Sequence, residues 1–272
     1  MPRIAVLQMT SGVDPEANYF ALEAAAIEAG RGGAEILFTP EMSVLLDKDR
    51  KRAGSWIEST EPNRISDRLD KLSAETGIDL AIGAMPVMGV NRRWANRSFY
   101  FGGPLGLRAT YDKIHMFDVQ LSNGESWRES AAYEPGTQVV TIDDTPLGRL
   151  GLTICYDMRF PALFEQLGQR KCDAIAVPAA FTVPTGRDHW HVMLRARAIE
   201  ASAFVIAAGQ VGQHEDGRET YGHSLVVDPW GKILLDMGGD KPGLAYCDID
   251  LSRVEEVRSQ LPSLANRRPI AK

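Results

Sequence analysis

Three side chains of the sequence could together carry out acyl transfer through a covalent intermediate. They are a thiol, a carboxylate and an ammonium, on Cys155, Glu41 and Lys113. A thiol can attack a carbonyl carbon when a base such as a carboxylate takes up its proton. An ammonium can stabilise the negative oxygen that the attack creates. Each of the three residues follows a run typical of a buried strand, and such a strand would hold the side chain at a sheet edge.

The setting of Cys155 is a bend between a strand and a helix. The strand-like run is Arg149–Ile154, and Pro161 suits the first position of a helix. Hydrolases hold a nucleophilic serine at such a bend, and a helix N-terminus nearby would favour the thiolate over the thiol. The alternative is a small buried residue at a strand end, which is also our interpretation of Cys172 and Cys247.

Glu41 and Lys113 also have both a chemical and a structural interpretation. Pro40 ends the strand before Glu41, and partial desolvation there would raise the carboxyl pKa toward that of a general base. The alternative is an exposed loop acid. Lys113 follows the strand-like run Leu107–Tyr111 and could stabilise an oxyanion. Its alternative is a surface ion pair with Asp112.

The histidines and glycines give weaker signals. A Cys–His thiol hydrolase is a rival interpretation, and its base would be one of His115, His189, His191, His214 and His223. None stands in a context typical of a protease. His189 and His191, two residues apart, would point to different sides of a helix. Because the sequence has no zinc-binding motif and no standard phosphate loop, we expect no metal site and no nucleotide cofactor.

Strand-like and helical runs alternate along the chain, which predicts an α/β fold with hairpins among the βα units. We expect strands at 4–9, 35–38, 79–85, 99–101, 107–111, 139–142, 149–154, 174–177, 204–208, 225–227, 232–235 and 244–248. We expect helices at 15–29, 65–75, 162–167, 189–202 and 251–259. The longest irregular stretch, roughly 113–138, is predicted to be either functional or disordered. With no linker and no repeat, residues 1–272 are expected to form one domain.

Composition excludes several kinds of partner. The net charge of −6 lacks a basic block, so we expect neither nucleic acid nor an anionic membrane as a partner. The N-terminus does not resemble a signal peptide, and no apolar run approaches a membrane span. Three widely spaced cysteines argue against a disulfide framework. These features favour a cytoplasmic protein.

The segments around the three reactive residues closely resemble motifs of the carbon–nitrogen hydrolase (nitrilase) superfamily. They are Phe38–Met42, Tyr111–Asp118 and Gly151–Pro161, with the three reactive residues 72 and 42 positions apart. The resemblance covers almost the whole chain. It implies a four-layer α-β-β-α sandwich, homodimers or larger homo-oligomers, and no metal or organic cofactor. It also implies a second glutamate, Glu129, six residues before Pro135, rather than Glu134.

The resemblance implies a role for each site residue. Glu41 would accept the proton of Cys155, which would form a thioester with the substrate. Lys113 and the backbone N–H of Tyr156 would stabilise the oxyanion. Glu129 would orient Lys113 or the substrate amide. A catalytically silent scaffold of the same fold is the alternative, against which the complete set of side chains argues.

Within the superfamily the sequence is most similar to amidases of deaminated glutathione. The segments that carry this similarity are Cys155–Pro161, His189–Glu200 and Tyr221–Gly231. The alternatives are an ω-amidase of 2-oxo acid amides such as 2-oxoglutaramate, an N-carbamoyl amino acid hydrolase, an aliphatic amidase and a true nitrilase. Tyr156 disfavours the last, which typically has tryptophan after the cysteine.

Substrate contacts are expected near the nucleophile. Because deaminated glutathione carries carboxylates, Arg159, four residues after Cys155, is a candidate cation to hold one. A structural ion pair is the equally weighted alternative for Arg159. Phe181 and Thr185 are expected on the loop after the strand at 174–177, reaching the same sheet edge. We expect the substrate to be a small molecule.

Overall fold

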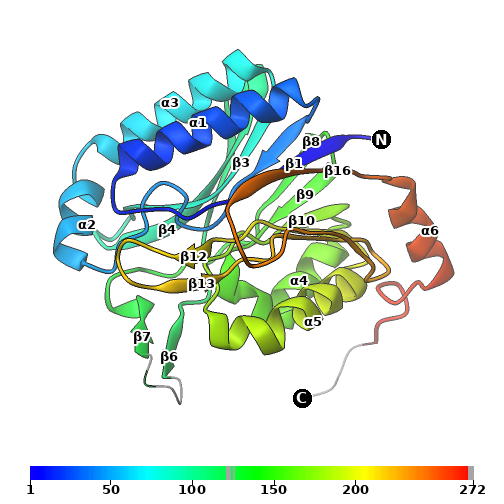
Figure 1. Cartoon of the computed structure of the whole chain (residues 1–272). Coiled ribbons are helices and arrows are strands. Elements are labelled where there is room, and N and C mark those ends of the chain that lie inside the picture. The colour runs from blue at the N-terminus through cyan, green and yellow to red at the C-terminus, as the bar shows by residue number, and fades with distance from the viewer. Residues whose placement is uncertain (121–123, 125, 269–272) are drawn as a thin grey trace.

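Two six-stranded sheets form the centre of the computed structural model, which describes residues 1–120, 124 and 126–268 (Figure 1). The strands of the first sheet, in spatial order, are β16 (Gly243–Asp248), β1 (Arg3–Gln8), β2 (Ile36–Phe38), β3 (Asp79–Met88), β4 (Trp94–Gly102) and β5 (Leu107–Asp112). Those of the second sheet are β15 (Ile233–Asp236), β14 (Leu225–Val227), β11 (Phe204–Ala207), β10 (Ala174–Ala176), β9 (Gly148–Leu152) and β8 (Thr141–Thr145).

The middle strands of each sheet are parallel. In the first sheet β1 pairs with β2 and β2 with β3, and in the second β9 pairs with β10 and β10 with β11. Strands buried on both faces read as continuous apolar runs, which is why the sequence reveals them. The carboxyl ends of parallel strands meet at one edge, so residues that follow β2 and those that follow β9 each leave the sheet at such an edge.

The α-helices of the described chain are α1 (Pro15–Arg31), α2 (Arg50–Ile57), α3 (Glu61–Thr76), α4 (Pro161–Gln169), α5 (Val183–Ala201) and α6 (Ser252–Gln260). Helices α1 and α3 cover the outer face of the first sheet and α4 and α5 that of the second, whereas α2 and α6 lie at opposite ends of the molecule (Figure 1). Alternation along β1 shows the layering: Val6 packs in one core with Leu152 of the other sheet, whereas Ala5 packs in a second core with Leu22 of α1. The predicted α-β-β-α sandwich is confirmed.

The helix ends agree in part with the sequence. Asp14 caps α1 and accepts from the backbone N–H of Glu16 and of Ala17, which agrees with the predicted start at residue 15. The helix ends at Arg31, two residues beyond the predicted end at residue 29. Helix α2 was not predicted because its basic residues mask a short apolar face. Helix α5 begins at Val183, earlier than predicted, since the proline after Val183 suits a first turn.

Short hairpins lie in segments that the sequence left irregular. Strands β6 (Asp118–Gln120) and β7 (Ser126–Arg128) pair inside the long stretch after β5, and β7 is followed by the 3₁₀ turn η2 (Glu129–Ala131). Strands β12 (Val211–Gln213) and β13 (Glu219–Tyr221) form a second hairpin. Each strand is three residues long, too short to show a period in sequence.

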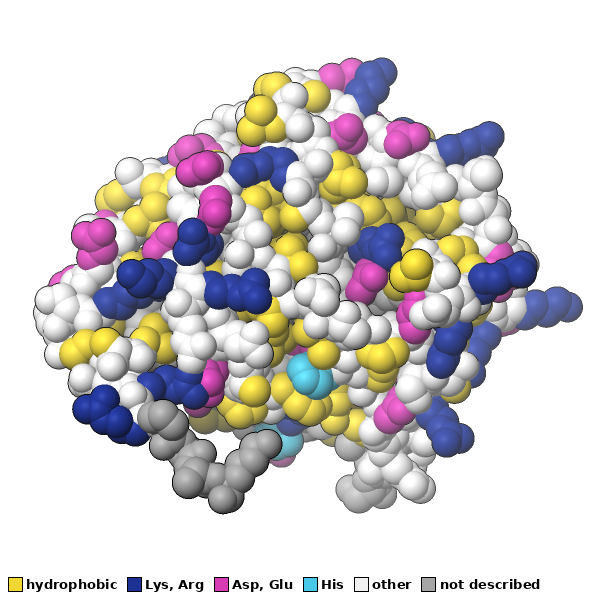
Figure 2. Space-filling view, turned by 180° about the vertical axis from the view of Figure 1, so that it is seen from behind, with side chains coloured by type: hydrophobic (Ala, Val, Ile, Leu, Met, Phe, Trp, Pro, Cys, Tyr) yellow, Lys and Arg dark blue, Asp and Glu magenta, His cyan; other side chains and the backbone are white. Residues whose placement is uncertain are grey.

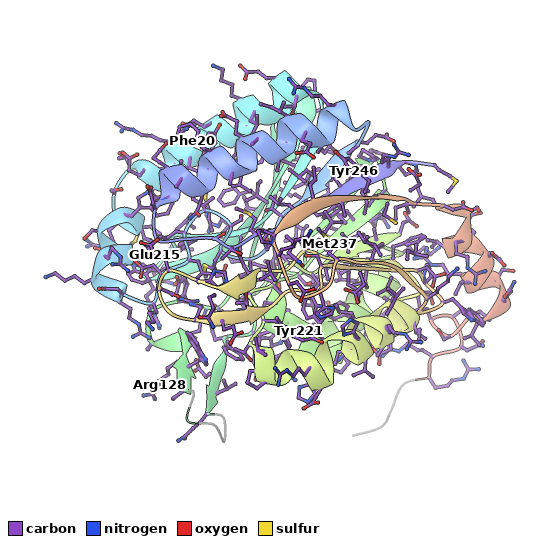
Figure 3. The ribbon with its side chains drawn as sticks, viewed as in Figure 1. Phe20, Arg128, Glu215, Tyr221, Met237 and Tyr246 are labelled. Carbon is purple, nitrogen blue, oxygen red and sulfur yellow. The ribbon has the colours of Figure 1, made fainter. Side chains whose placement is uncertain are left out.

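The surface carries acidic and basic side chains interspersed, as the face behind that of Figure 1 shows (Figure 2). Tyr246 lies on β16, the edge strand of the first sheet (Figure 3). Its hydroxyl donates to the carbonyl of Glu28 in α1 at 3.0 Å. Among the described residues, no helix is both long and apolar enough to cross a bilayer.

Candidate active site

Glu41 and Cys155 reach one site from opposite sheets. Glu41 follows β2 by three residues and Cys155 follows β9 by three residues. The two sheets are tied together there, because the N–H of Ala180, which follows β10, donates to Oε2 of Glu41 at 2.9 Å. The side chain of Gln210 also donates to the carbonyl of Glu41, at 3.0 Å. The predicted strand-end residues are therefore brought together by the packing of the two sheets.

The backbone at Cys155 is held in an unusual conformation. Its φ of +47° lies in the left-handed region, which residues with a side chain seldom adopt outside turns and functional sites. The N–H of Cys155 donates to the carbonyl of Pro178 at 2.8 Å, and the 3₁₀ turn η3 (Cys155–Arg159) follows at once. Within the described residues the next N–H, that of Tyr156, has no acceptor, so it remains able to donate to a ligand.

A buried aspartate fixes this turn, a role that sequence reasoning did not assign to it. Asp157 accepts from the N–H of Ile154 at 2.9 Å and from the hydroxyl of Tyr111 at 2.6 Å. It also accepts from the backbone N–H of His115 at 3.0 Å. The turn that carries the thiol is thus bonded to the end of β5, which leads into Lys113.

Lys113 lies between two carboxylates. Its Nζ is 3.0 Å from Oε1 of Glu41 and 2.9 Å from Oε2 of Glu129. Glu129 is held in turn by the N–H of Phe117 at 2.6 Å. The side chains of Glu41 and Lys113 are 5% and 2% exposed, so these charges meet away from bulk water, where their attraction is strong.

Asn96 of β4 completes the network, and sequence reasoning missed it. Its Nδ2 donates to Oε1 of Glu41 at 2.8 Å and to Oε1 of Glu129 at 3.2 Å. Its backbone carbonyl accepts from the N–H of Lys113 at 2.9 Å. The amide of Asn96 is fully buried, but the polar residues Arg97 and Ser98 follow it in β4, so the sequence does not single it out.

The charges set the protonation states of the site. Burial works to raise the pKa of Glu41, but Lys113, the thiol of Cys155 and the N–H of Ala180 outweigh it and hold that pKa below its ordinary value. The expectation of a raised pKa for Glu41 is therefore wrong, because the carboxylate is paired with an ammonium. Burial would lower the pKa of Lys113, but Glu129 and Glu41 raise it well above its ordinary value. Both groups stay charged at neutral pH.

The thiol is protonated in the resting site. Burial, followed by the charge of Glu41, raises the pKa of Cys155 well above its ordinary value. The expectation that a helix N-terminus favours the thiolate is therefore wrong at this position. The resting arrangement is a thiol beside an ionised carboxylate, ready for a proton transfer that accompanies attack on a carbonyl.

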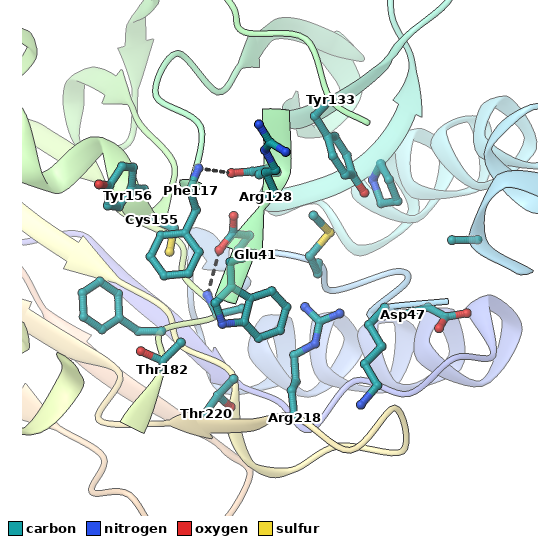
Figure 4. A pocket seen from close by; sticks show the side chains of 18 of the residues that line it. Glu41, Asp47, Phe117, Arg128, Tyr133, Cys155, Tyr156, Thr182, Arg218 and Thr220 are labelled. Carbon is teal, nitrogen blue, oxygen red and sulfur yellow. Dashed lines mark hydrogen bonds between the residues drawn. The ribbon is translucent and has the colours of Figure 1, made fainter. Parts of the chain in front are cut away.

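These residues line a cavity of about 770 Å³. Figure 4 shows Glu41 beside Cys155 in this cavity, with Tyr156 next to the thiol. Phe181 and Thr185, both predicted, also line it. Thr185 belongs to the first turn of α5 rather than to the predicted loop.

Arg159 lies next to two residues of the cavity lining, Phe181 and Tyr156. It does not line the cavity, but its guanidinium carbon is 5.4 Å from the ring centre of Phe181 and 5.8 Å from that of Tyr156. It donates to Nδ1 of His189 at 3.2 Å. Throughout the part of the chain that is described, no carboxylate pairs with Arg159, so the structural ion pair is not formed there.

No histidine of the described chain lines the cavity, which argues against a Cys–His hydrolase. His115 stacks on Phe160 with ring centres 3.6 Å apart. His191 and His223 each contact Asp236 at 2.9 Å, and this trio, which lies outside the cavity lining, could hold a metal ion. The prediction that His189 and His191 form no metal pair considered only these two neighbours in sequence, whereas His191 lies beside the more distant His223 and Asp236.

Comparisons with known proteins agree with this site. The family model described as carbon-nitrogen hydrolase matches residues 3–259. The deaminated glutathione amidase of Yersinia enterocolitica is 36% identical, over 97% of this chain and 92% of that protein. That of Bos taurus is 37% identical, over 99% and 83%.

Solved structures show the same fold. The NitFhit protein of Caenorhabditis elegans matches with a TM-score of 0.91 and 34% identity, over 98% of this chain and 65% of that one. A variant of the amidase from Nesterenkonia sp. AN1, in which acrylamide has added to the active-site cysteine, matches with a TM-score of 0.80 and 25% identity, over 96% and 98%. The chain described here belongs to the carbon–nitrogen hydrolase family and is an amidase.

Proposed function

We propose that the enzyme hydrolyses the amide bond of deaminated glutathione. The observation that carries this proposal is the buried Glu41–Lys113–Cys155 network at a cavity of about 770 Å³. The similarity to amidases of that name supports the substrate. Cleavage would release a 2-oxo dicarboxylate and the dipeptide amine that was bound to it.

The proposed reaction uses one carboxylate twice. Glu41 accepts the proton of Cys155 as the sulfur attacks the amide carbonyl, and the new oxyanion is stabilised by Lys113 and the N–H of Tyr156. Glu41 then gives this proton to the leaving amine, and the carbon–nitrogen bond breaks. Water, activated by the same carboxylate, hydrolyses the thioester and returns the proton to the thiol. Glu129 and Asn96 position Lys113 and Glu41 throughout.

A comparison of kcat/KM for four substrates tests the assignment. Deaminated glutathione would yield a carboxylic acid and a primary amine, 2-oxoglutaramate and a nitrile would each yield a carboxylic acid and ammonia, and an N-carbamoyl amino acid would yield the amino acid, ammonia and carbon dioxide. We expect the highest kcat/KM for deaminated glutathione. A higher kcat/KM for 2-oxoglutaramate would favour the ω-amidase alternative, and release of carbon dioxide would favour the carbamoyl hydrolase. Absence of turnover with all four would favour a silent scaffold.

Glu41→Gln should change turnover and thiol reactivity in opposite directions. Loss of the general base should lower kcat about 10²- to 10⁴-fold. The thiol pKa should fall, because the charge of Glu41 raises it and Lys113 lowers it in the native site. Iodoacetamide should therefore modify Cys155 faster in the variant than in the native enzyme at neutral pH.

Glu134→Gln is the matched control, since Glu134 contacts Asn91 away from this network. It should leave both the turnover and the alkylation rate near their native values. Native turnover by Glu41→Gln would contradict the proposed role of Glu41 as the base. Slower alkylation, measured by mass spectrometry of the Cys155 peptide, would contradict the expected effect of its charge on the thiol pKa.

Arg159 is proposed to hold a substrate carboxylate, with Phe181 and Thr185 lining the pocket for the acyl half. Arg159→Met should lower kcat/KM for a carboxylate-bearing amide about 10- to 100-fold. The effect should be mainly on KM and much smaller for an uncharged aliphatic amide. An equal loss for both substrates would assign Arg159 a structural role at the Phe181 wall.

We also propose that the chain acts as one domain, in a homodimer or larger homo-oligomer, in the cytoplasm. Support for assembly comes from the outer face of α5, where Val192 is 60% and Ile199 is 42% exposed, next to the 49% exposed Trp230. The three free cysteines fit a reducing compartment. Light scattering should give a multiple of 29.9 kDa, and a single-chain mass would contradict the assembly.

A further inference from the structure

The cavity has a second end that the proposed chemistry does not use. It is formed by the segment before α2, by β7 and by the β12–β13 turn, all of which contribute lining residues. Figure 4 shows Arg218 and Asp47 on the far side of Glu41 from Cys155 and Tyr156. Figure 3 shows Arg128 on β7 and Glu215 in the β12–β13 turn at the same end of the molecule. We call the cations of this end, Lys48, Arg50, Arg128 and Arg218, the distal cations.

Among the residues that line this end of the cavity, the four distal cations outnumber the two acids, Asp47 and Glu219. Asp216, which pairs with Arg218, and Glu215 of the same turn lie outside the lining. Asp47, which also lines this end, is already paired with Arg52 at 2.6 Å. Lys48, Arg50 and Arg128 have no carboxylate partner in residues 1–120, 124 and 126–268, and Glu219 is the remaining acid of the lining at this end. In a chain with a net charge of −6, this local excess of positive charge favours an anionic ligand.

Arg218 is held in place before any ligand arrives. The buried carboxylate of Asp216 accepts from its Nε at 2.8 Å and lies 2.6 Å from its Nη2. The same carboxylate accepts from the backbone N–H of Lys48 at 2.9 Å. The guanidinium carbon lies 5.2 Å from the ring centre of Trp127. Fixing a cation in this way reduces the entropy lost when it binds a carboxylate.

Two donors at this end remain available. Asp216 engages only Nε and Nη2 of Arg218, and no hydrogen bond of the described residues involves Nη1. The indole N–H of Trp127 is buried without a partner in the same part of the chain. A buried donor without an acceptor is unusual in a native protein, and an acceptor supplied by a ligand would satisfy it.

We infer that the distal cations bind the terminal carboxylate of the leaving amine, with Arg218 as its main contact. The inference rests on the proposed function and extends it to the half of the substrate that departs. The dipeptide amine of deaminated glutathione ends in a carboxylate, whereas the ammonia released from 2-oxoglutaramate has no such group. This end of the cavity therefore selects amides whose leaving amine is a peptide with a free terminal carboxylate over primary amides.

The first test changes the substrate and leaves the protein native. Converting the terminal carboxylate of deaminated glutathione to its neutral amide should lower kcat/KM about 10- to 100-fold, mainly through KM. A change of less than twofold would overturn the inference. Absence of turnover with both deaminated glutathione and 2-oxoglutaramate would contradict the proposed function instead, so the two failures are distinguishable.

The second test changes the protein. Arg218→Met should lose at least tenfold more kcat/KM on deaminated glutathione than on 2-oxoglutaramate, and the neutral-amide substrate should lose little further activity in this variant. Arg187→Met, on the exposed surface of α5 outside the cavity, is the matched control. Equal losses on both substrates would overturn the inference.

A third variant covers the case in which Arg218→Met fails to fold, since it leaves the buried Asp216 unpaired. Lys48→Met removes a distal cation without leaving a buried acid. It should raise KM for deaminated glutathione severalfold with kcat little changed, and it should reduce the dependence of kcat/KM on ionic strength. An unchanged KM and salt dependence, together with insensitivity to the neutral-amide substitution, would overturn the inference.

Discussion

Cys155→Ala should reduce amide turnover by at least about 10⁴-fold, as expected for loss of a nucleophile that acts as a unit with its base. Glu41 and Lys113 would still hold each other at 3.0 Å in this variant. Because the variant has no sulfur to form the thioester, we expect it to bind the substrate but not to hydrolyse the amide. The measurement is the initial rate with deaminated glutathione, together with substrate affinity by calorimetry.

The native enzyme provides the complementary measurement. Acid quenching during turnover should trap an acyl group on the peptide that contains Cys155, detected by mass spectrometry. Cys172→Ala is the matched control, since Cys172 is buried in the core away from the cavity lining. Native turnover by Cys155→Ala, or an acyl group on Cys172 or Cys247, would refute the mechanism.

Lys113→Met should lower both kcat and the free energy of unfolding. Removal of the ammonium leaves Glu41 and Glu129 as buried carboxylates without their shared partner. Breaking a buried ion pair from one side typically lowers the free energy of unfolding by about 3–5 kcal/mol. Loss of the oxyanion contact should lower kcat about 10²- to 10³-fold. Urea denaturation and initial rates measure the two effects separately.

The shifted pKa values of Lys113 and Glu41 determine how their contribution to the free energy of unfolding changes with pH. The raised pKa of Lys113 means that its contribution is complete below the pKa of an unfolded lysine, about 10.4, and is lost as pH rises through the folded value. The lowered pKa of Glu41 means that its contribution is present above its unfolded value and is lost as pH falls through the folded one. Lys113→Met should therefore raise the pKa of Glu41, and its loss of stability relative to the native enzyme should be largest near neutral pH and should shrink as falling pH neutralises the unpaired carboxylate. Lys71→Met, at an exposed helical pair, should show neither effect.

Much of the fold could be predicted because the relevant signals are local. The apolar runs of β1 and β9, the cap at Asp14 and the left-handed Gly77 at the end of α3 each depend on neighbours in sequence. The hairpin β12–β13 could not be predicted, since pairing across the chain, rather than a pattern within it, keeps such short strands extended.

The residues of the candidate site also fall into two groups, those that could be predicted from local sequence and those that could not. Glu41, Lys113 and Cys155 each follow a strand, and motif resemblance added Glu129. Asn96 and Arg218 are held in place by partners such as Glu41 and Asp216, and a single sequence does not contain these contacts. The pKa of Glu41 was predicted in the wrong direction for this reason: burial could be inferred, but the number of donors around the carboxylate could not.

The catalytic residues come from two sheets, so enzyme activity depends on the packing of one sheet against the other. Glu41 leaves the first sheet and Cys155 leaves the second, and the cross-sheet bond from Ala180 to Glu41 joins them. A partly unfolded chain in which either sheet survives alone would keep many of its strands but would have no working site. Enzyme activity during denaturation should therefore report when the two halves of the sandwich separate, an event that circular dichroism of the strands alone would miss.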